Sequence, residues 1–263
     1  TPQVERAAEF PFQQGGLQLG VRRRLARELH GQFDTAYVLP NSLKSALLPF
    51  LASIPRRVGY LGEARVGLLT HRLPNPKGKP PMVAFYSALS GQVDGLAQDR
   101  PQLHLPPPAI DDALAAQGVA RGEYHVFAPG AEYGPSKRWP PEHYAALART
   151  LDRPVLLLGS GKDAAVCDEI ASAAPQCRNL AGKTSLAEAF ALIAAARAVV
   201  SNDSGLMHVA AAFGVPQVAL FGSSSPLHTP PLNDRAAVVW LKQDPDYQPP
   251  LDCAPCFARE CPL

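Results

Sequence analysis

Residues 201–216, "SNDSGLMHVAAAFGVP", place an acid, a hydroxyl, a glycine and a histidine within eight positions. They follow the apolar run "AVV", which is typical of a buried strand. A helix is expected to begin near Ser204, and Gly214 and Pro216 are the usual signals for its end. The polar residues therefore lie where a strand ends and a helix begins. In parallel sheets that position is where ligands bind.

The chemistry of this stretch suits a ligand with two kinds of group. A helix N-terminus offers unpaired N–H groups and about half a positive charge, and Ser204 and Gly205 would let a phosphate approach the backbone. The carboxylate of Asp203 would repel a phosphate, so we expect it to accept hydrogen bonds from hydroxyl groups. Phosphate at one end and polyol at the other indicate a sugar nucleotide. Two plainer interpretations stay open: Asp203 or Ser204 caps the helix, or His208 is a satisfied core histidine.

A second loop carries positive charge at an equivalent position. The stretch "APGAEYGPSKRWPP", residues 128–141, follows a strand directly and places Lys137 and Arg138 just before a helix. A cation in a strand-to-helix loop is a candidate clamp for an anion. The alternative is a solvated pair of surface charges above Trp139. For Lys137 we favour the clamp.

A competing motif, "GSGKDA" at 159–164, matches the weak form of the dinucleotide fingerprint. The acid expected about 20 residues further on is missing, because the chain there reads "CRNLAGKT". Nor does it fit a phosphate-binding P-loop, since Lys162 is followed by Asp163. We expect residues 160–163 to form one wall of the ligand crevice.

The elements that position these loops alternate between strand and helix, which is typical of an α/β protein with parallel sheets. Strands are expected over 34–40, 56–62, 125–130, 154–160, 197–202 and 217–222, and helices over 42–52, 162–173, 185–196 and 204–213. Another helix should open at Pro140 and Pro141. A Pro-rich stretch at 101–122 marks a shift of composition. We therefore expect two domains, residues 1–122 and 123–263.

Composition excludes several classes of protein. The net charge of +2 gives no general reason to expect nucleic acid as a partner. The chain has no apolar run of the roughly 20 residues that a membrane-spanning helix needs, and we expect a cytoplasmic protein. Five cysteines do not suggest a disulfide framework. Cys253, Cys256 and Cys261 have the spacing of metal ligands, but three thiolates fall short of the usual four. We expect no metal and no cofactor.

Three long stretches carry a resemblance to a known family. They are "PGAEYGPSKRWPPEHYAALA", "NLAGKTSLAEAFALIAAARAVVSNDSGLMHVAAAFGVPQVALFGSSSP" and "YVLPNSLKSALLPF" with the later "IPRRVGYLGEARVGLL". Together they closely resemble the bacterial lipopolysaccharide heptosyltransferases of glycosyltransferase family 9. The resemblance covers nearly the whole chain and agrees with the sugar nucleotide predicted above.

The resemblance implies a GT-B fold, in which two Rossmann-like domains face a cleft. It implies inverting, metal-independent transfer of L-glycero-D-manno-heptose from ADP-heptose to the first heptose of the lipid A inner core. The acceptor would bind the first domain and the donor the second. Peripheral contact with the cytoplasmic face of the inner membrane would accompany this acceptor. The donor-site residues that the resemblance implies are Glu132, Tyr133, Lys137, Thr184, Asp203, Ser204, Gly205 and His208, with Lys137 on the diphosphate and Asp203 on the heptose hydroxyls.

The chain departs from the family pattern at its ends. Relatives open with a strand and a G-x-x-G-D loop whose aspartate acts as the base, whereas this sequence resembles a region beyond two βα units. The final stretch "ARECPL" likewise precedes the C-terminal helices of the family. We expect the general base to lie outside these residues, and this chain alone to bind donor but be nearly inactive.

The acceptor site is predicted from basic residues of the first domain. Lys44, Arg56, Arg57 and Arg65 are candidates for the phosphorylated inner core, because arginine pairs well with phosphate, and ordinary surface charge is the alternative for each. The run Arg22, Arg23 and Arg24 is expected on a solvated helix face.

Other functions stay open at this point. A sister heptosyltransferase with another acceptor is the nearest alternative, followed by a noncatalytic module that binds nucleotide sugars. An NAD-dependent oxidoreductase would rest on "GSGKDA" alone.

Overall fold

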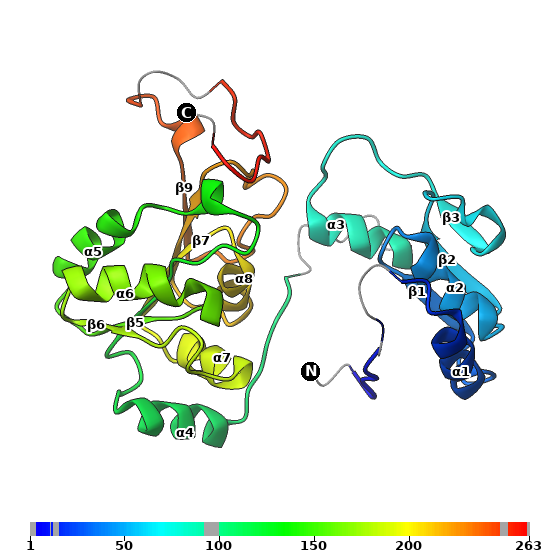
Figure 1. Cartoon of the computed structure of the whole chain (residues 1–263), viewed down its shortest axis with the longest axis horizontal. Helices are drawn as coiled ribbons and strands as arrows, with labels where there is room; N and C mark the ends of the chain where they lie inside the picture. The colour runs from blue at the N-terminus through cyan, green and yellow to red at the C-terminus, as the bar shows by residue number, and fades with distance from the viewer. Residues whose placement is uncertain (1–3, 11, 13–15, 92–99, 248–251, 262–263) are drawn as a thin grey trace. The chain divides into compact units, whose positions relative to one another are not determined.

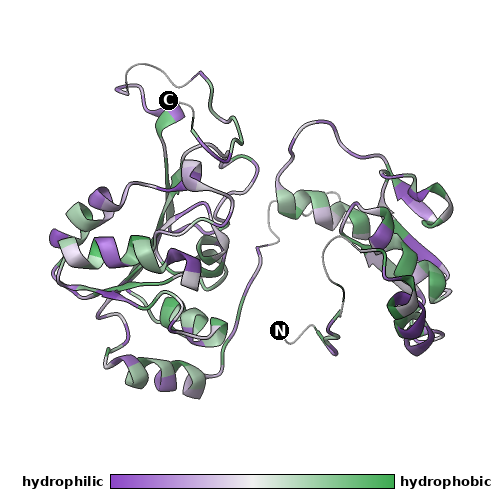
Figure 2. Ribbon diagram, in the orientation of Figure 1, coloured by the Kyte–Doolittle hydropathy of each residue, from purple (hydrophilic) through white to green (hydrophobic). Residues whose placement is uncertain are grey.

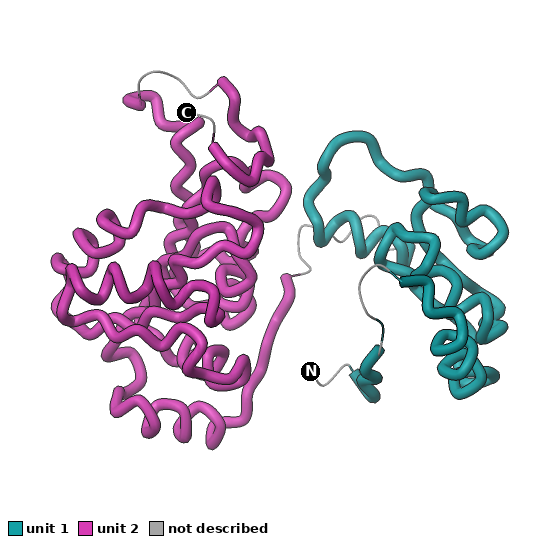
Figure 3. The backbone as a smooth tube through the Cα atoms, in the orientation of Figure 1, with its two compact units in different colours: residues 1–99 teal, residues 100–263 magenta. Residues whose placement is uncertain are grey.

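The computed structural model describes residues 4–10, 12, 16–91, 100–247 and 252–261. Two compact units divide the chain, Thr1–Asp99 and Arg100–Leu263 (Figure 3). The division lies before the expected boundary at residue 122, because α4 (Pro107–Gln117) belongs to the second unit. Its apolar residues Ile110 and Leu114 are buried in the core of that unit, so the Pro-rich composition marks the approach to α4 rather than a linker beyond it.

The first unit is a small parallel α/β layer. Its sheet runs in the order β1 (Thr35–Val38), β2 (Arg56–Tyr60) and β3 (His71–Leu73), with parallel pairing throughout. Its helices are α1 (Leu19–Leu29), α2 (Leu43–Leu51) and α3 (Met82–Ser87). Residues of α1 and α2, among them Ala26 and Leu48, share one apolar cluster.

One arginine of α1 is buried, contrary to the expectation of a wholly solvated face. Arg22 is 6% exposed, and its guanidinium lies 4.0 Å from the centroid of the Phe12 ring. It donates to the carbonyls of Leu17 and Lys44, each at 2.8 Å. Because these bonds satisfy the buried charge, Arg22 fixes α1 against α2, while Arg23 and Arg24 are exposed as expected.

The second unit is built on six parallel strands in the order β6-β5-β4-β7-β8-β9 (Figure 1). The strands are β4 (His125–Ala128), β5 (Val155–Leu157), β6 (Cys177–Asn179), β7 (Ala198–Asn202), β8 (Gln217–Phe221) and β9 (Ala236–Trp240). This is the doubly wound order, in which the chain starts at β4, moves to one edge and then returns to the other side of β4. The loops after β4 and β7 therefore open a crevice at the carboxyl edge of the sheet.

Helices cover both faces of this sheet. The residues of α5 (Pro141–Arg149) and α6 (Ala164–Ala173) pack into one apolar cluster, and those of α4, α7 (Leu186–Ala194) and α8 (Gly205–Ala212) into another. Figure 2 shows hydrophobic and hydrophilic residues alternating around the turns of α4 and α6, as expected for helices with one buried face. The central strands have no such alternation, because both of their faces are buried.

Candidate donor-binding site

The site begins at the junction of β7 and α8, where the sequence analysis placed it. Ser204 is the N-cap residue of α8, but its side chain makes no capping hydrogen bond. The carboxylate of Asp203 bonds elsewhere: Oδ2 accepts from Lys137 Nζ at 2.6 Å, and Oδ1 accepts from the Thr229 hydroxyl at 3.2 Å. The side-chain capping interpretation is therefore wrong for Ser204, and Asp203 has another role.

Lys137 and Asp203 lie closer together than the sequence indicated. The predicted roles placed one on a diphosphate and the other on sugar hydroxyls, yet the two side chains form a direct salt bridge. Lys137 Nζ also lies 5.4 Å from the centroid of the Tyr133 ring, within the range of a cation–π contact. The pair holds the loop after β4 against the end of β7.

His208 lies one turn into α8, on its exposed side. The core-histidine interpretation is therefore wrong. Partial desolvation of the ring lowers the pKa of His208, and the charge of Lys137 lowers it further, while Asp203 acts in the opposite direction. The lowered pKa favours the neutral imidazole, which has one donor and one acceptor.

Asn202, which the sequence analysis did not single out, is the scaffold of the site. It is fully buried, and its Oδ1 accepts from the Trp139 backbone N–H at 3.0 Å and from the Tyr144 hydroxyl at 3.1 Å. Its Nδ2 donates to the Pro129 carbonyl at 2.7 Å. One amide thus joins both ends of the loop after β4 to the end of β7. An asparagine at a strand end gives no sequence signal strong enough to predict this.

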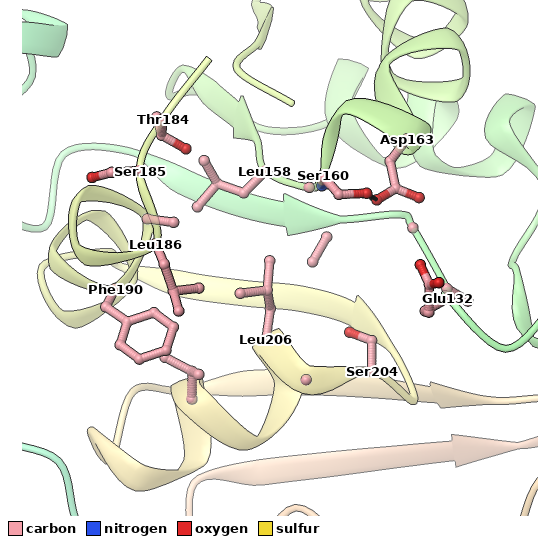
Figure 4. A pocket seen from close by; sticks show the side chains of 17 residues that line it. Glu132, Leu158, Ser160, Asp163, Thr184, Ser185, Leu186, Phe190, Ser204 and Leu206 are labelled. Carbon is pink, nitrogen blue, oxygen red and sulfur yellow. Dashed lines mark hydrogen bonds between the residues drawn. The ribbon is translucent and has the colours of Figure 1, made fainter. Parts of the chain in front are cut away.

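A pocket of about 480 Å³ lies beside this junction (Figure 4). In Figure 4 the apolar side chains of Leu158, Leu186, Phe190 and Leu206 lie along one part of it, and Glu132 and Ser204 lie at the other end. Among the predicted donor residues, the pocket is lined by Glu132, Thr184, Ser204 and Gly205, whereas Tyr133, Lys137, Asp203 and His208 are not among its lining residues. The predicted set therefore divides into a pocket group and a charged group next to it.

The "GSGKDA" stretch forms one wall of the pocket, as expected. Ser160 and Asp163 form a capping box, and the Asp163 carboxylate lies 3.6 Å from Arg138 Nη2. A Cβ atom on Gly130 would lie 2.4 Å from this carboxylate, and one on Gly159 would lie 2.9 Å from Asp163 Cβ. The Asp163 side chain therefore occupies the space between the two loops, which a dinucleotide fingerprint would leave open for a pyrophosphate.

Two predicted donor residues already have protein partners. Glu132 accepts from Lys162 at 2.7 Å, and this bond lowers the pKa of the exposed Glu132 carboxyl. The Tyr133 hydroxyl donates to the Phe257 carbonyl at 2.5 Å. Of the two, only Glu132 lines the pocket.

The predicted acceptor residues differ in their surroundings. Arg65 is 1% exposed and donates to the carbonyls of Pro40 and Tyr60 and to the Asn41 side chain. This is a correction: the Arg65 guanidinium holds the loop after β2 and has no surface on which to meet a phosphorylated sugar. Desolvation lowers the pKa of Arg65.

Three acceptor candidates remain, and they occupy opposite edges of the first sheet. Arg56 and Arg57 begin β2, at the amino edge, and Arg57 donates to the carbonyls of Leu68 and Ile54. Lys44 lies in the first turn of α2, after the carboxyl end of β1. Since ligands of parallel sheets bind at the carboxyl edge, Lys44 has the most suitable position of the three.

The cysteine motif does not assemble a metal site. Cys253, Cys256 and Cys261 are free and exposed. Within the described ranges, no three His, Cys, Asp or Glu side chains are grouped as a metal site would require. In the same part of the chain, no helix is long and apolar enough to cross a membrane.

The fold and the site define a class of protein. A doubly wound sheet with a mostly apolar pocket and a charged pair at its switch point is the arrangement of nucleotide-binding α/β proteins. The chain belongs to glycosyltransferase family 9, the heptosyltransferases, because the model of this family matches residues 22–263.

Individual relatives agree with this assignment. Lipopolysaccharide heptosyltransferase 2 of Escherichia coli K12 is 45% identical over 260 residues, which are 91% of this chain and 74% of the relative. Lipooligosaccharide heptosyltransferase 2 of Haemophilus influenzae Rd is 46% identical, with 91% of this chain and 75% of the relative covered.

The solved structures confirm the predicted α/β fold of the GT-B type. The structure of E. coli ADP-heptose lps heptosyltransferase II matches with a TM-score of 0.76 and 44% identity, over 84% of this chain and 73% of that one. A family 9 glycosyltransferase of Veillonella parvula shares the fold with a TM-score of 0.76 at 21% identity, over 86% of this chain and 69% of that chain.

Proposed function

We propose that this heptosyltransferase is of the second type and transfers L-glycero-D-manno-heptose from ADP-heptose to the first heptose of the lipid A inner core. Relatives of type 2 support the acceptor choice, since they match 91% of the chain at 45–46% identity. A type 1 relative from Pseudomonas aeruginosa matches 58% of the chain at 33% identity. The observation that carries the donor assignment is the contact of Lys137 with Asp203 beside the α8 N-terminus.

The proposed donor occupies both parts of the site. The pocket, with its apolar wall of Leu158, Leu186, Phe190 and Leu206, suits an adenine ring, and the hydroxyls of Thr184 and Ser204 suit the ribose. The diphosphate would meet the N–H groups at Gly205 and the ammonium of Lys137. The heptose hydroxyls would then lie against Asp203, with His208 as a neutral partner.

The proposed reaction is a single displacement with inversion. The acceptor hydroxyl oxygen attacks the anomeric carbon while the bond from that carbon to the ADP oxygen breaks, and ADP leaves with the bonding electrons. Positive charge develops on the sugar and negative charge on the leaving diphosphate. Lys137 and the α8 N–H groups supply the balancing positive charge, so no metal ion is required for that role. Each such donor is typically worth about 100- to 1,000-fold in rate. A general base takes the proton of the acceptor hydroxyl.

The acceptor is proposed to bind the first unit through its basic side chains. Lys44, at the carboxyl edge of the first sheet, is the candidate for the phosphorylated inner core, with Arg56 and Arg57 as weaker candidates. An acceptor anchored by lipid A would bring the protein to the cytoplasmic face of the inner membrane. Nucleic acid is not a proposed partner, because a net charge of +2 gives no general reason to expect one.

Calorimetric titration with ADP tests the donor site directly. Wild-type protein should bind ADP, and Lys137→Ala should bind it at least about tenfold more weakly, since a hydrogen bond to a charged group contributes about 1.5–3 kcal/mol. Titration with NADH is the matched control and should give no heat of binding. If the protein has a native circular dichroism spectrum but does not bind ADP, the proposal is contradicted. Tight binding of NADH would favour an oxidoreductase.

A further inference from the structure

The C-terminal segment returns to the donor site and lies against the loop that carries Lys137. Residues 257–259, called here the C-terminal strap, lie within the red segment of Figure 1 and form hydrogen bonds with this loop. Their three successive carbonyls all accept hydrogen bonds from the loop: Phe257 from the Tyr133 hydroxyl at 2.5 Å, Ala258 from Ser136 Oγ at 2.5 Å, and Arg259 from the Ser136 N–H at 3.2 Å.

The strap is also joined to the loop that follows β8. The Phe257 N–H donates to the Ser223 carbonyl at 2.8 Å, and the hydroxyls of Ser223 and Ser136 lie 2.9 Å apart. Two glycines permit this close approach. A Cβ atom on Gly134 would lie 2.4 Å from the Arg259 carbonyl oxygen, and one on Gly222 would lie 2.7 Å from the Ser136 carbonyl oxygen. Backbone therefore packs against backbone on both sides of Ser136.

These contacts lie next to Lys137, the proposed ligand of the diphosphate. Ser136 precedes Lys137, so the strap bonds to Ser136 fix the backbone from which the lysine side chain extends. Tyr133 approaches the same lysine from the side, with its ring centroid 5.4 Å from Lys137 Nζ. The strap holds the hydroxyl of that ring, and the Arg259 guanidinium lies 5.7 Å from the ring centroid.

We infer that the C-terminal strap is a positioning element for Lys137, and that Ser136 and Tyr133 act on donor binding through this strap. The inference rests on the proposed function, in which Lys137 contacts the diphosphate. It changes the role of Tyr133, which the sequence analysis assigned to the donor itself. A lysine side chain has several rotatable bonds and loses conformational entropy when its ammonium binds phosphate. Because the strap already fixes the backbone of the loop that carries Lys137, less entropy is lost on binding.

A double-mutant cycle on ADP affinity tests the inference. ADP and adenosine are titrated into the wild type, Ser136→Ala, Lys137→Ala and the double variant. If the strap acts through Lys137, Ser136→Ala should weaken ADP about three- to tenfold, as expected for one or two lost hydrogen bonds, and leave adenosine unchanged. In the Lys137→Ala background the same substitution should then have no further effect, because coupled residues are non-additive.

A comparison of two tyrosine substitutions distinguishes an effect on the position of Lys137 from a general effect on protein stability. Tyr133→Phe and Tyr124→Phe each remove one hydroxyl that donates to a backbone carbonyl at 2.5 Å within the same unit. Tyr124 is buried in the core beneath α7, where its hydroxyl bonds to Leu192. Tyr124→Phe should lower the melting temperature and leave the ADP affinity unchanged. Tyr133→Phe should weaken ADP binding about threefold, as expected for one hydrogen bond.

Each other outcome has a distinct meaning. A wild type that does not bind ADP overturns the proposed function. A wild type that binds ADP and is weakened by Lys137→Ala, with Ser136→Ala and Tyr133→Phe unchanged, overturns the strap alone. Additive losses in the cycle also overturn it, because the strap would then act on ADP independently of Lys137. If Ser136→Ala fails to fold, the Tyr133→Phe comparison decides.

Discussion

Lys137 Nζ and Asp203 Oδ2 lie 2.6 Å apart, and the two side chains are 17% and 5% exposed. The residues come from the loops after β4 and β7, so the salt bridge spans the point at which the chain reverses direction in the sheet. An ammonium has three N–H donors, of which this bond uses one. Lys137 can therefore hold Asp203 and a phosphate together, which reconciles their contact with their separate proposed roles.

The buried salt bridge predicts a specific pattern of stability. Lys137→Ala should lower the free energy of unfolding by about 1–3 kcal/mol, because it leaves the Asp203 carboxylate buried without its cation. The double variant Lys137→Ala with Asp203→Asn should recover most of this loss, since no buried charge remains. Urea denaturation of the wild type, the single variant and the double variant measures both effects. Equal stability of the single and double variants would contradict the argument.

Substitution of Thr229 is expected to weaken the binding of ADP-heptose without weakening the binding of ADP. Its hydroxyl donates to Asp203 Oδ1 at 3.2 Å and so orients the carboxylate proposed for the heptose hydroxyls. Thr229→Val should weaken ADP-heptose about three- to tenfold, as expected when hydrogen bonds to the sugar are misaligned, while ADP affinity stays unchanged. Calorimetry with both ligands makes the measurement.

Thr150→Val is the matched control for that substitution, because the Thr150 hydroxyl donates locally, to the Leu147 carbonyl at the end of α5. It should alter neither affinity. An equal loss of ADP and ADP-heptose in Thr229→Val would indicate a general disturbance of the site instead of an oriented carboxylate.

Much of the fold followed from the sequence because strong local signals and the fold agreed. The expected strand at 197–202 is Ala198–Asn202, and the helix expected at 204–213 is Gly205–Ala212, with Gly214 directly after its C-cap residue. Parallel topology then placed Asp203 and Lys137 at one edge. Ser204, Gly205 and the "GSGKDA" wall were located for the same reason, since each follows the end of an apolar strand, whereas Glu132 and Thr184 were predicted only through the family resemblance.

The parts that the sequence did not reveal depend on contacts between distant residues. Nothing in the pattern around Arg65 distinguishes a buried guanidinium bonded to carbonyls from a surface charge. The role of Asn202 exists only when Trp139, Tyr144 and Pro129 converge on one amide. The strap bonds link residues more than 120 positions apart through backbone carbonyls, which carry no residue-specific signal.

Substitution of Gly130 tests how tightly the wall of the pocket is packed. The new methyl group of Gly130→Ala would lie 2.4–2.6 Å from the Asp163 carboxylate, which is held by the Ser160 capping box and Arg138. Because the carboxylate cannot move without losing these bonds, the variant should lose about 1–3 kcal/mol of stability, the usual cost of overpacking. Gly161→Ala lies in the same wall with no atom within 4 Å of its added methyl group, and it should differ little from the wild type. Urea denaturation compares the two variants, and similar losses would contradict this account.

His125, at the start of β4, is expected to contribute to the loss of stability of the second unit at acidic pH. Burial lowers the pKa of its imidazole, and the charges of Arg197 and Arg153 lower it further against the opposing effect of Asp152. In the unfolded chain a histidine binds its proton with a pKa of about 6.5. Between that value and the lowered folded pKa, the unfolded state binds more protons, so the free energy of unfolding decreases as the pH falls through this window.

His208 should also decrease the free energy of unfolding as the pH falls, because its pKa is lowered in the folded protein too. Urea denaturation between pH 7.5 and pH 5 should therefore show a stability loss that begins near pH 6.5, as the unfolded histidines start to bind protons. His125→Gln should reduce the loss, and His125→Gln with His208→Gln should reduce it further, because neither glutamine titrates. If the double variant loses as much stability as the wild type over this range, His125 and His208 are not its cause, and the carboxylates that protonate at lower pH become the explanation to test.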